Sequence, residues 1–300
     1  MPAQQVTYPL ANPTVSGNSL TVDMALEQPK RVTRRIMDIT LRRFIIDRIF
    51  ATGGSATGSV IYDQATTNEL YTDRDVERVA PGSEFPIVGS QTTVPKIALA
   101  EKWGGKFPIT REARRRNNVV RFNNQVTQLA NTIVRKVNTN AVATLEAAIS
   151  GLGGAGTFVG HNWGAVVTSG SGQTNNSGWP AADFAMAQLL AEQDELGVNY
   201  NLWIVNPVQK FQLITAYGNA LPDMLEAAGI EELYPSPQVA NGTAYAVARG
   251  EVGALDVEQG LETETWEDKS IQSDWVQSSV VPIMYVTNPY SIKKVTGLNG

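Results

Sequence analysis

Two glycine-rich segments of the chain could bind phosphate groups. Gly104, Gly105 and Lys106 resemble the end of a P-loop, in which backbone N–H groups and a lysine hold nucleotide phosphates. Position 100 is Ala and position 107 is Phe, where that motif needs Gly and Ser or Thr. Residues 151–156 have glycines spaced somewhat as in dinucleotide-binding proteins, but they follow a predicted helix instead of a strand. We therefore predict no phosphate site in either segment.

The side chains that most often perform catalysis are scarce in this chain. It has no cysteine, which excludes disulfides, thiol nucleophiles and Cys-based zinc sites. Its single histidine, His161, makes a multi-histidine metal site or a catalytic triad within one chain improbable. His161 lies in a polar loop, where a lone histidine is usually a surface residue. We predict no catalytic residue, no metal site and no cofactor, and we expect that the protein is not an enzyme.

A run of carboxylates near the C-terminus could supply oxygen ligands to a hard cation. The run lacks the Asp/Asn–Gly loop of a calcium site, and it alternates with Thr263, Thr265 and Trp266, which indicates the solvent face of a strand. We predict that this acidic face meets a basic partner. The residues assigned to it are Glu258, Glu262, Glu264, Glu267 and Asp268.

A basic segment near the N-terminus has the opposite character. Residues 30–48 carry seven Lys and Arg against Asp38 and Asp47. Three interpretations remain open: contact with nucleic-acid phosphates, pairing with the acidic half of a neighbouring copy, or a solvated helix face. The residues assigned to this basic arm are Arg31, Arg34, Arg35, Arg42 and Arg43.

The charge of the whole chain is divided between its two halves. Residues 1–140 carry 19 Lys and Arg against 12 Asp and Glu, and residues 141–300 carry 5 against 17. This division favours contacts between copies of the chain. No apolar run approaches the roughly 20 residues that span a bilayer, and residues 1–17 lack the features of a secretory signal. We expect no membrane partner and no export.

The elements that must position these side chains change along the N-terminal half. Residues 1–29 contain four prolines and predict an extended arm. Residues 30–50 partly fit a helical stripe through Val32 and Ile36, although their β-branched content also allows a strand in the second half. Residues 60–107 contain strand-like runs between turn-forming residues. They predict a long, polar, two-stranded excursion that needs a partner for stability.

A very long helix follows this excursion. Apolar residues repeat at spacings of three and four from Thr110, whose hydroxyl can cap the helix, to Ile149. Asn117 and Asn118 indicate a bend. Residues 150–179 are rich in Gly, Ser and Asn and predict a long loop.

The last part of the chain predicts a compact α/β block and then strands. The block contains a helix over Pro180–Leu196, a strand over Leu202–Val205, and helices over Val208–Tyr217 and Pro222–Ala228. The strands predicted after it are Ala244–Ala248, Leu261–Trp266, Ser279–Val286 and Ser291–Thr296.

The order of these elements, and three groups of motifs within them, resemble the major capsid proteins of tailed bacteriophages, which share the Hong Kong 97 fold. The first group is ERVAPGSEFP (77–86) with PKIALAEKWGGKFPITREA (95–113), similar to the extended loop and the start of the spine helix. The second, over 179–214, is similar to the axial-domain helix, strand and helix. The third, over 260–298, is similar to the peripheral strands and ends in NPYSIKKV.

The resemblance implies an α+β fold with five parts: an N-terminal arm (1–57), an extended β-hairpin loop (58–108), a spine helix (109–150), an axial α/β domain (151–258), and peripheral-domain strands with a C-terminal return (259–300). It further implies that the extended loop contacts other subunits. The loop residues assigned to this contact are Arg74, Arg78, Pro81, Gly82, Glu84 and Phe85. Because the loop tip lacks lysine, we expect none of the covalent cross-links that some family members form.

The function implied is that of a structural subunit of a virion capsid, assembled in the host cytoplasm. Copies of the chain would form pentamers and hexamers that join into an icosahedral shell around packaged double-stranded DNA. Further partners would be the portal and, left open, scaffolding or decoration proteins. Two alternatives are the shell of a cellular nanocompartment of encapsulin type, with the same fold, and, more remotely, a soluble enzyme built around a glycine loop.

Overall fold

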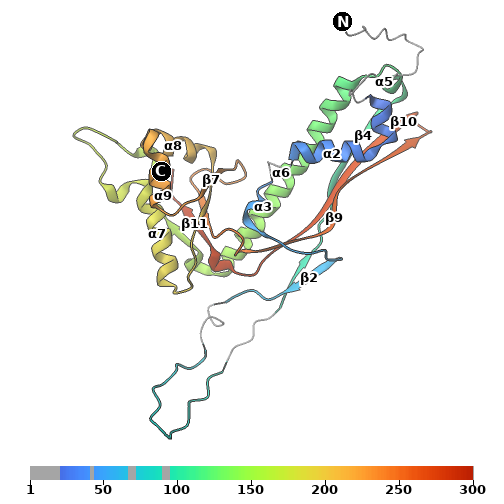
Figure 1. Cartoon of the computed structure of the whole chain (residues 1–300). Coiled ribbons are helices and arrows are strands. Elements are labelled where there is room, and N and C mark those ends of the chain that lie inside the picture. The colour runs from blue at the N-terminus through green and yellow to red at the C-terminus, as the bar shows by residue number, and fades with distance from the viewer. Residues whose placement is uncertain (1–20, 41–43, 67–71, 90–94, 300) are drawn as a thin grey trace.

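The computed structural model describes residues 21–40, 44–66, 72–89 and 95–299 (Figure 1). A five-stranded sheet with helices forms one end, the axial unit. A four-stranded sheet and a long helix form an elongated arm, the peripheral unit, and a narrow loop projects away from both units (Figure 1). This is the mixed helix-and-sheet architecture that the sequence predicted.

The sheet of the peripheral unit is built on a long antiparallel hairpin. Strand β9 (Gly253–Asp268) pairs with β10 (Ser273–Val286), and the strand order is β1-β9-β10-β4. Along β9, exposed positions alternate with more buried ones, as expected for a sheet with one face against a core. The outer strands are β1 (Ala51–Thr52) and β4 (Trp103–Thr110).

The spine helix α6 (Val119–Gly151) covers the inner face of this sheet. Its buried apolar side chains recur at helical spacing, and the Asn118 side chain caps its first turn by accepting from the Arg121 N–H. A short helix α5 (Arg111–Arg115) precedes it and is capped by Thr110, as predicted. Asn117 adopts a φ of 47°, so the predicted bend is a complete break between two helices.

The sequence predicted an extended arm over residues 1–29, and for residues 22–29 this prediction was wrong. Residues 1–20 lie outside the described part, but α1 (Val22–Glu27) and α2 (Pro29–Thr40) are helices. Val32 and Ile36 are fully buried in a cluster with side chains of β4, α6 and β10, and this packing stabilises α2. Residues 44–50 also contain no strand of the kind considered for the second half of residues 30–50, because Ile46–Ile49 forms the short helix α3.

The axial unit contains a sheet with strand order β5-β11-β8-β6-β7. Its helices α7, α8 and α9 confirm the predicted helices with small shifts of their ends, and Gly197 and Gly229 follow α7 and α9 with positive φ. The bounds are β5 (Thr157–Val159), α7 (Pro180–Gln193), β6 (Leu202–Val205), α8 (Pro207–Tyr217), α9 (Leu221–Ala227), β7 (Glu232–Pro235), β8 (Ala244–Val247) and β11 (Ile292–Thr296). The 3-10 helices are η1 (Gly153–Gly156), η2 (Trp163–Ala165), η3 (Asn176–Gly178), η4 (Gly218–Ala220) and η5 (Pro289–Ser291).

Three expectations about boundaries differ from the structure. The segment 150–179 is not all loop, since it contains β5, which pairs with β11. The boundary placed at residue 258 falls inside β9, which begins at Gly253. The last strand, β11, belongs to the axial sheet, so the chain returns from the peripheral unit to the axial unit.

Within its described residues, the predicted β excursion has strands only near its base and in its final segment. Near the base, β2 (Ser59–Tyr62) pairs with β3 (Lys96–Leu99). Residues 72–89 contain no strand, and the end of the predicted excursion belongs to β4 in the peripheral sheet. Among the described residues, no second layer packs against the apolar side chains of 72–89, so the usual stabilisation of a hairpin is missing there.

Candidate assembly surfaces

The extended loop, residues 72–89, is closed at its neck by its own backbone. The Asp73 N–H donates to the Gly89 carbonyl over 3.1 Å, and the Gly89 N–H donates to the Asp73 carboxylate over 2.7 Å. A side chain at position 89 would lie within 2.7 Å of that carboxylate, which explains the glycine. The chain reverses at Ala80–Ser83, where Gly82 has a φ of 88°. Pro followed by Gly suits such a turn.

The tip of this loop exposes charged and apolar side chains together. Phe85 is 77% exposed and Ile87 is 85% exposed, values unusual for such large apolar groups. Figure 1 shows the loop reaching away from both units, so these side chains are remote from the cores of their own chain. The predicted contact residues Arg74, Arg78, Pro81, Gly82 and Glu84 are all exposed. The structure therefore brings the six predicted loop residues together on one projection.

The base of the excursion is fixed to the hairpin of β9 and β10. The buried Asp256 carboxylate accepts from the Gly54 N–H and from the Tyr285 hydroxyl, and Glu258 accepts from the Gly58 N–H over 2.8 Å. The contacts of Gly54 and Gly58 join residues about 200 positions apart in the sequence. The direction in which the loop leaves the molecule is thus set by two carboxylates of β9.

The basic arm lies on helix α2. Arg31 and Arg34 are exposed and Arg35 is half-buried, on the side of α2 away from Val32 and Ile36. Arg42 and Arg43, the other two residues of this prediction, lie outside the described part of the chain.

The acidic face is exposed to solvent, and most of its carboxylates also accept hydrogen bonds from groups of their own chain. Glu258, Glu262 and Glu264 point to the solvent side of β9. Glu267 forms an ion pair with Arg111, and its pKa is lowered chiefly because the Arg111 guanidinium donates a hydrogen bond to it. Asp268 accepts from the hydroxyl and the N–H of Ser270, which lowers its pKa. Glu267 and Asp268 therefore stabilise the hairpin end of their own chain.

The outer face of the peripheral sheet carries a cluster that the sequence did not reveal. Trp266 and Trp275 stack with ring centroids 6.4 Å apart, and the Lys106 ammonium lies 4.6 Å from the Trp275 ring. Register places Lys106 and Glu264 on either side of Gln277. Neighbouring strands form this cluster, so spacing within one segment could not have indicated it.

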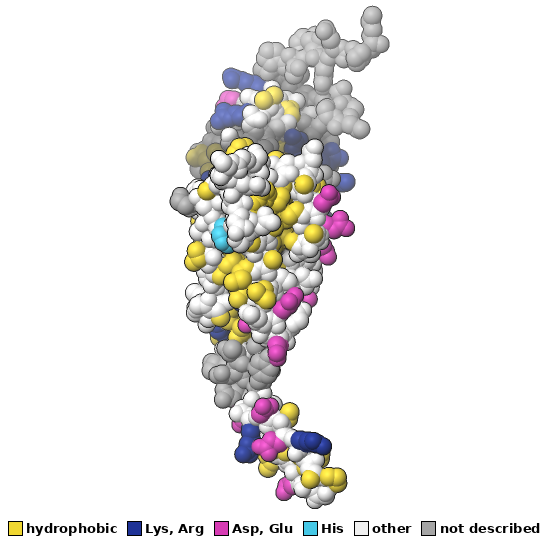
Figure 2. Space-filling model, turned by 90° about the vertical axis from the view of Figure 1, so that its left-hand side faces the viewer, with side chains coloured by type: hydrophobic (Ala, Val, Ile, Leu, Met, Phe, Trp, Pro, Cys, Tyr) yellow, Lys and Arg dark blue, Asp and Glu magenta, His cyan; other side chains and the backbone are white. Residues whose placement is uncertain are grey.

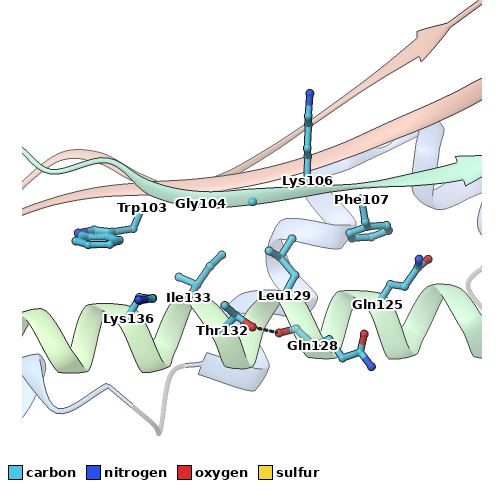
Figure 3. Close-up of a pocket in the computed structure, with 11 residues that line it drawn as sticks. Trp103, Gly104, Lys106, Phe107, Gln125, Gln128, Leu129, Thr132, Ile133 and Lys136 are labelled. Atoms are coloured by element: carbon cyan, nitrogen blue, oxygen red, sulfur yellow. Dashed lines mark hydrogen bonds between the residues drawn. The ribbon is translucent and has the colours of Figure 1, made fainter. Parts of the chain in front are cut away.

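The glycine–lysine segment Gly104–Lys106 forms part of strand β4. A cavity of about 290 Å³ separates β4 from α6 and is lined by Trp103, Phe107, Leu129 and Ile133 among others. Figure 3 shows Lys106 pointing away from α6 and out of this cavity. A Cβ at Gly105 would approach Leu129 within 2.9 Å, so this glycine permits close packing of strand on helix.

The axial unit presents a second surface that sequence reasoning did not single out. Val208, Phe211 and Ile214 lie at helical spacing on α8 and are exposed, next to a cavity of about 320 Å³ lined in part by Trp163 and Val166. Figure 2 shows apolar side chains gathered on this side of the molecule. The three-residue spacing within α8 was a signal that could have identified this stripe.

The single histidine has a structural environment. The Asp183 carboxylate, which is 1% exposed, accepts from the His161 N–H and from the Trp163 indole N–H, and it lies 2.7 Å from His161 Nδ1. These contacts fix the segment that leads from β5 to η2. Within the described ranges no group of His, Cys, Asp and Glu side chains is arranged to hold a metal ion, and no helix there could span a bilayer.

Several solved structures share this architecture, whereas no match is found among curated proteins. Among solved structures, a virus-like particle from Pyrococcus furiosus has a TM-score of 0.59 at 12% identity, covering 89% of this chain and 98% of the other. A structure from Mycobacterium phage Bobi has 0.58 at 11% identity (86% and 89%), and the capsid of Myoviridae phage XM1 has 0.57 at 11% (84% and 90%).

These likenesses define the class of fold: the chain has the Hong Kong 97 fold of these capsid and virus-like-particle structures. The sequence model of a family described as phage capsid protein matches residues 93–295, about two thirds of the chain. The chain therefore belongs to the phage capsid protein family, and it is a major capsid protein of the tailed-phage type. Its role is structural.

Proposed function

We propose that copies of this chain form pentamers and hexamers that join into an icosahedral shell around double-stranded DNA. The observation that carries the proposal is the loop 72–89, which exposes Phe85 and Ile87 where its own chain cannot cover them. A second subunit that covered these side chains would gain about 1.5–3 kcal/mol for each. Repeated at every subunit, such heterologous contacts would add together in a lattice that closes.

The division of charge supports the same arrangement. The predicted contact residues of the loop include Arg74 and Arg78, and the acidic face offers Glu262 and Glu264. Opposite charges favour one register of neighbouring subunits over others. Assembly would take place in the host cytoplasm, with the portal, and scaffolding or decoration proteins where present, as further partners.

The experiment is to replace Phe85→Ser together with Ile87→Ser and to measure assembly by sedimentation and negative-stain electron microscopy. We expect a folded protein that sediments as small species, because the contact across subunits is lost. The matched control, Phe85→Leu with Ile87→Val, keeps an apolar surface and should still form shells. Normal shells from the serine variant would contradict the proposal.

One observation favours a second candidate, the shell of a cellular nanocompartment. The chain covers 98% of the virus-like particle from Pyrococcus furiosus, so the two subunits have nearly the same extent. Such a shell would enclose cargo enzymes instead of DNA. The content of purified particles, nucleic acid or a second protein, separates the two candidates, as do neighbouring genes for a terminase and portal or for a cargo enzyme.

A further inference from the structure

Helix α2 presents a fixed cationic surface. Val32 and Ile36 are fully buried beneath it, so the helix cannot rotate about its axis without exposing them. Lys30, Arg31 and Arg34 are exposed on the remaining surface, and Arg35 is half-buried beside them. We call these four side chains the α2 basic face. Figure 1 shows α2 lying on the outside of the peripheral unit.

The α2 basic face has no anionic partner within the described part of the chain. The ion pairs formed there involve Arg48, Arg111, Arg114, Arg249, Lys293, Lys294 and His161, and none of the four residues of the face. Asp38 is an exposed carboxylate on the same helix, and it forms no ion pair with Arg34 or Arg35. The face therefore keeps an excess of positive charge for an external anion.

The two sides of the peripheral unit differ in charge. The helical side, with α2, α5 and α6, also exposes Arg115, Arg116, Arg121, Arg135 and Lys136. On the opposite side, β9 directs Glu262 and Glu264 to solvent, in register with Lys106, which points away from α6 (Figure 3). A subunit whose helical side carries the excess of positive charge would turn that side toward an enclosed polyanion.

The acidic face of a neighbouring copy is the competing partner, and most of its carboxylates are already engaged. Glu267 pairs with Arg111, Asp268 accepts from Ser270, Glu258 accepts from Gly58, and Glu262 accepts from Gln259 over 3.0 Å. Four of the five predicted acidic residues thus have partners within their own chain. Of the five, only Glu267 has a cationic partner in the described part of the chain, so a neighbour's acidic face keeps negative charge and is the alternative that the experiment must exclude.

We propose that the α2 basic face binds the phosphate backbone of double-stranded DNA without sequence preference, and that it lies on the inner surface of the shell. This inference rests on the proposed function, since it requires a shell that encloses DNA. Arginine donors suit phosphate oxygens because their N–H groups match the geometry. Each phosphate that the face neutralises releases a counterion, so binding weakens as salt rises.

The test is assembly of purified full-length protein with excess fluorescent 20-base-pair duplex between 50 and 200 mM NaCl. Nuclease then removes unprotected duplex, and the protected duplex per subunit is measured. A duplex this short is far below the persistence length of DNA, so bending does not enter. We expect wild-type shells to protect more duplex per subunit than the solution volume they enclose would contain. This excess should fall as the NaCl concentration rises.

The variant is Arg31→Gln, Arg34→Gln and Arg35→Gln together. We expect shells that protect duplex near the passive level, with a slope of log binding against log salt shallower by about 2.7, at roughly 0.9 for each lost phosphate contact. The matched control removes the same charge elsewhere, through Lys210→Gln, Arg249→Gln and Lys269→Gln. It should behave as wild type.

Two results would overturn the inference. One is a glutamine variant that protects as much duplex as wild type. The other is a folded glutamine variant that makes no shells, which would assign the face to a neighbouring subunit. Should that variant not fold, the single variants Arg31→Gln, Arg34→Gln and Arg35→Gln take its place. Intact shells of all three that protect as much duplex as wild type would refute the inference. Wild type that forms no shells refutes the proposed function instead.

Discussion

The position of Gly53 gives a sharp test of how the extended loop is anchored. A Cβ atom at this position would lie 2.1 Å from the Asp256 carboxylate and 2.9 Å from the Leu255 carbonyl oxygen. Gly53→Ala must therefore move the carboxylate, the strand β9 or the loop base. Gly54 is next in the chain, but a Cβ there would meet only the Asp256 carboxylate, at an ordinary 3.9 Å. The two substitutions add the same methyl group one residue apart.

The expected size of the effect follows from what Asp256 holds. Its buried carboxylate accepts from the Gly54 N–H and from the Tyr285 hydroxyl. Displacing it breaks two hydrogen bonds to a carboxylate, whose donors can then turn to water, at about 1–2.5 kcal/mol each. Gly53→Ala should thus lower the free energy of unfolding by roughly 2–5 kcal/mol, within the range of strongly disruptive substitutions. Gly54→Ala should stay within about 0.5 kcal/mol of wild type or stabilise slightly.

The assay combines thermal unfolding with limited proteolysis of the purified protein. Gly53→Ala should lower the midpoint by several degrees, at about 2–4 °C per kcal/mol for a large domain. It should also accelerate cleavage within residues 53–66, because the base of the excursion is no longer held to β9. Equal midpoints and equal cleavage for the two alanine variants would refute the anchoring role assigned to Asp256.

Two further predictions concern the axial unit. Asp183→Ala removes the acceptor of the buried Trp163 indole N–H and of the His161 N–H; thermal unfolding should show a loss of roughly 2–5 kcal/mol, and a loss below about 1 kcal/mol would contradict that role. Burial and the nearby Glu146 raise the pKa of Tyr245 well above 10, so the stability it contributes is present below pH 10 and is lost at higher pH. Tyr245→Phe should flatten the decline of the thermal midpoint between pH 9 and 11, and an unchanged decline would contradict this assignment.

Local patterns predicted those elements that local chemistry stabilises. The apolar spacing through Val126 and Ile133 predicted α6, and the Thr110 hydroxyl predicted the cap of α5. Pro180 and Gly197 predicted the limits of α7 to within a few residues. In each case the signal and the structure lie within one or two helical turns, so no distant partner had to be known.

The features that escaped prediction depend on residues far apart in the sequence. Helix α2 forms because Val32 and Ile36 pack with α6, and nothing within residues 1–29 indicated that α1 would join them. Strand β11 enters the axial sheet beside β5, more than 130 residues earlier. Among the assembly surfaces, the exposed loop could be predicted from its composition and from the family resemblance. The Trp266–Trp275 stack could not, because it depends on the register of β9 and β10.

The central claim is that this chain is the subunit of a closed shell held together by its projecting loop. The most direct measurement is cryo-electron microscopy of the purified full-length protein. We predict closed icosahedral particles of pentamers and hexamers, with Phe85 and Ile87 of each loop buried against a neighbouring subunit. Discrete small oligomers, or closed particles in which residues 72–89 remain in solvent, would contradict the account.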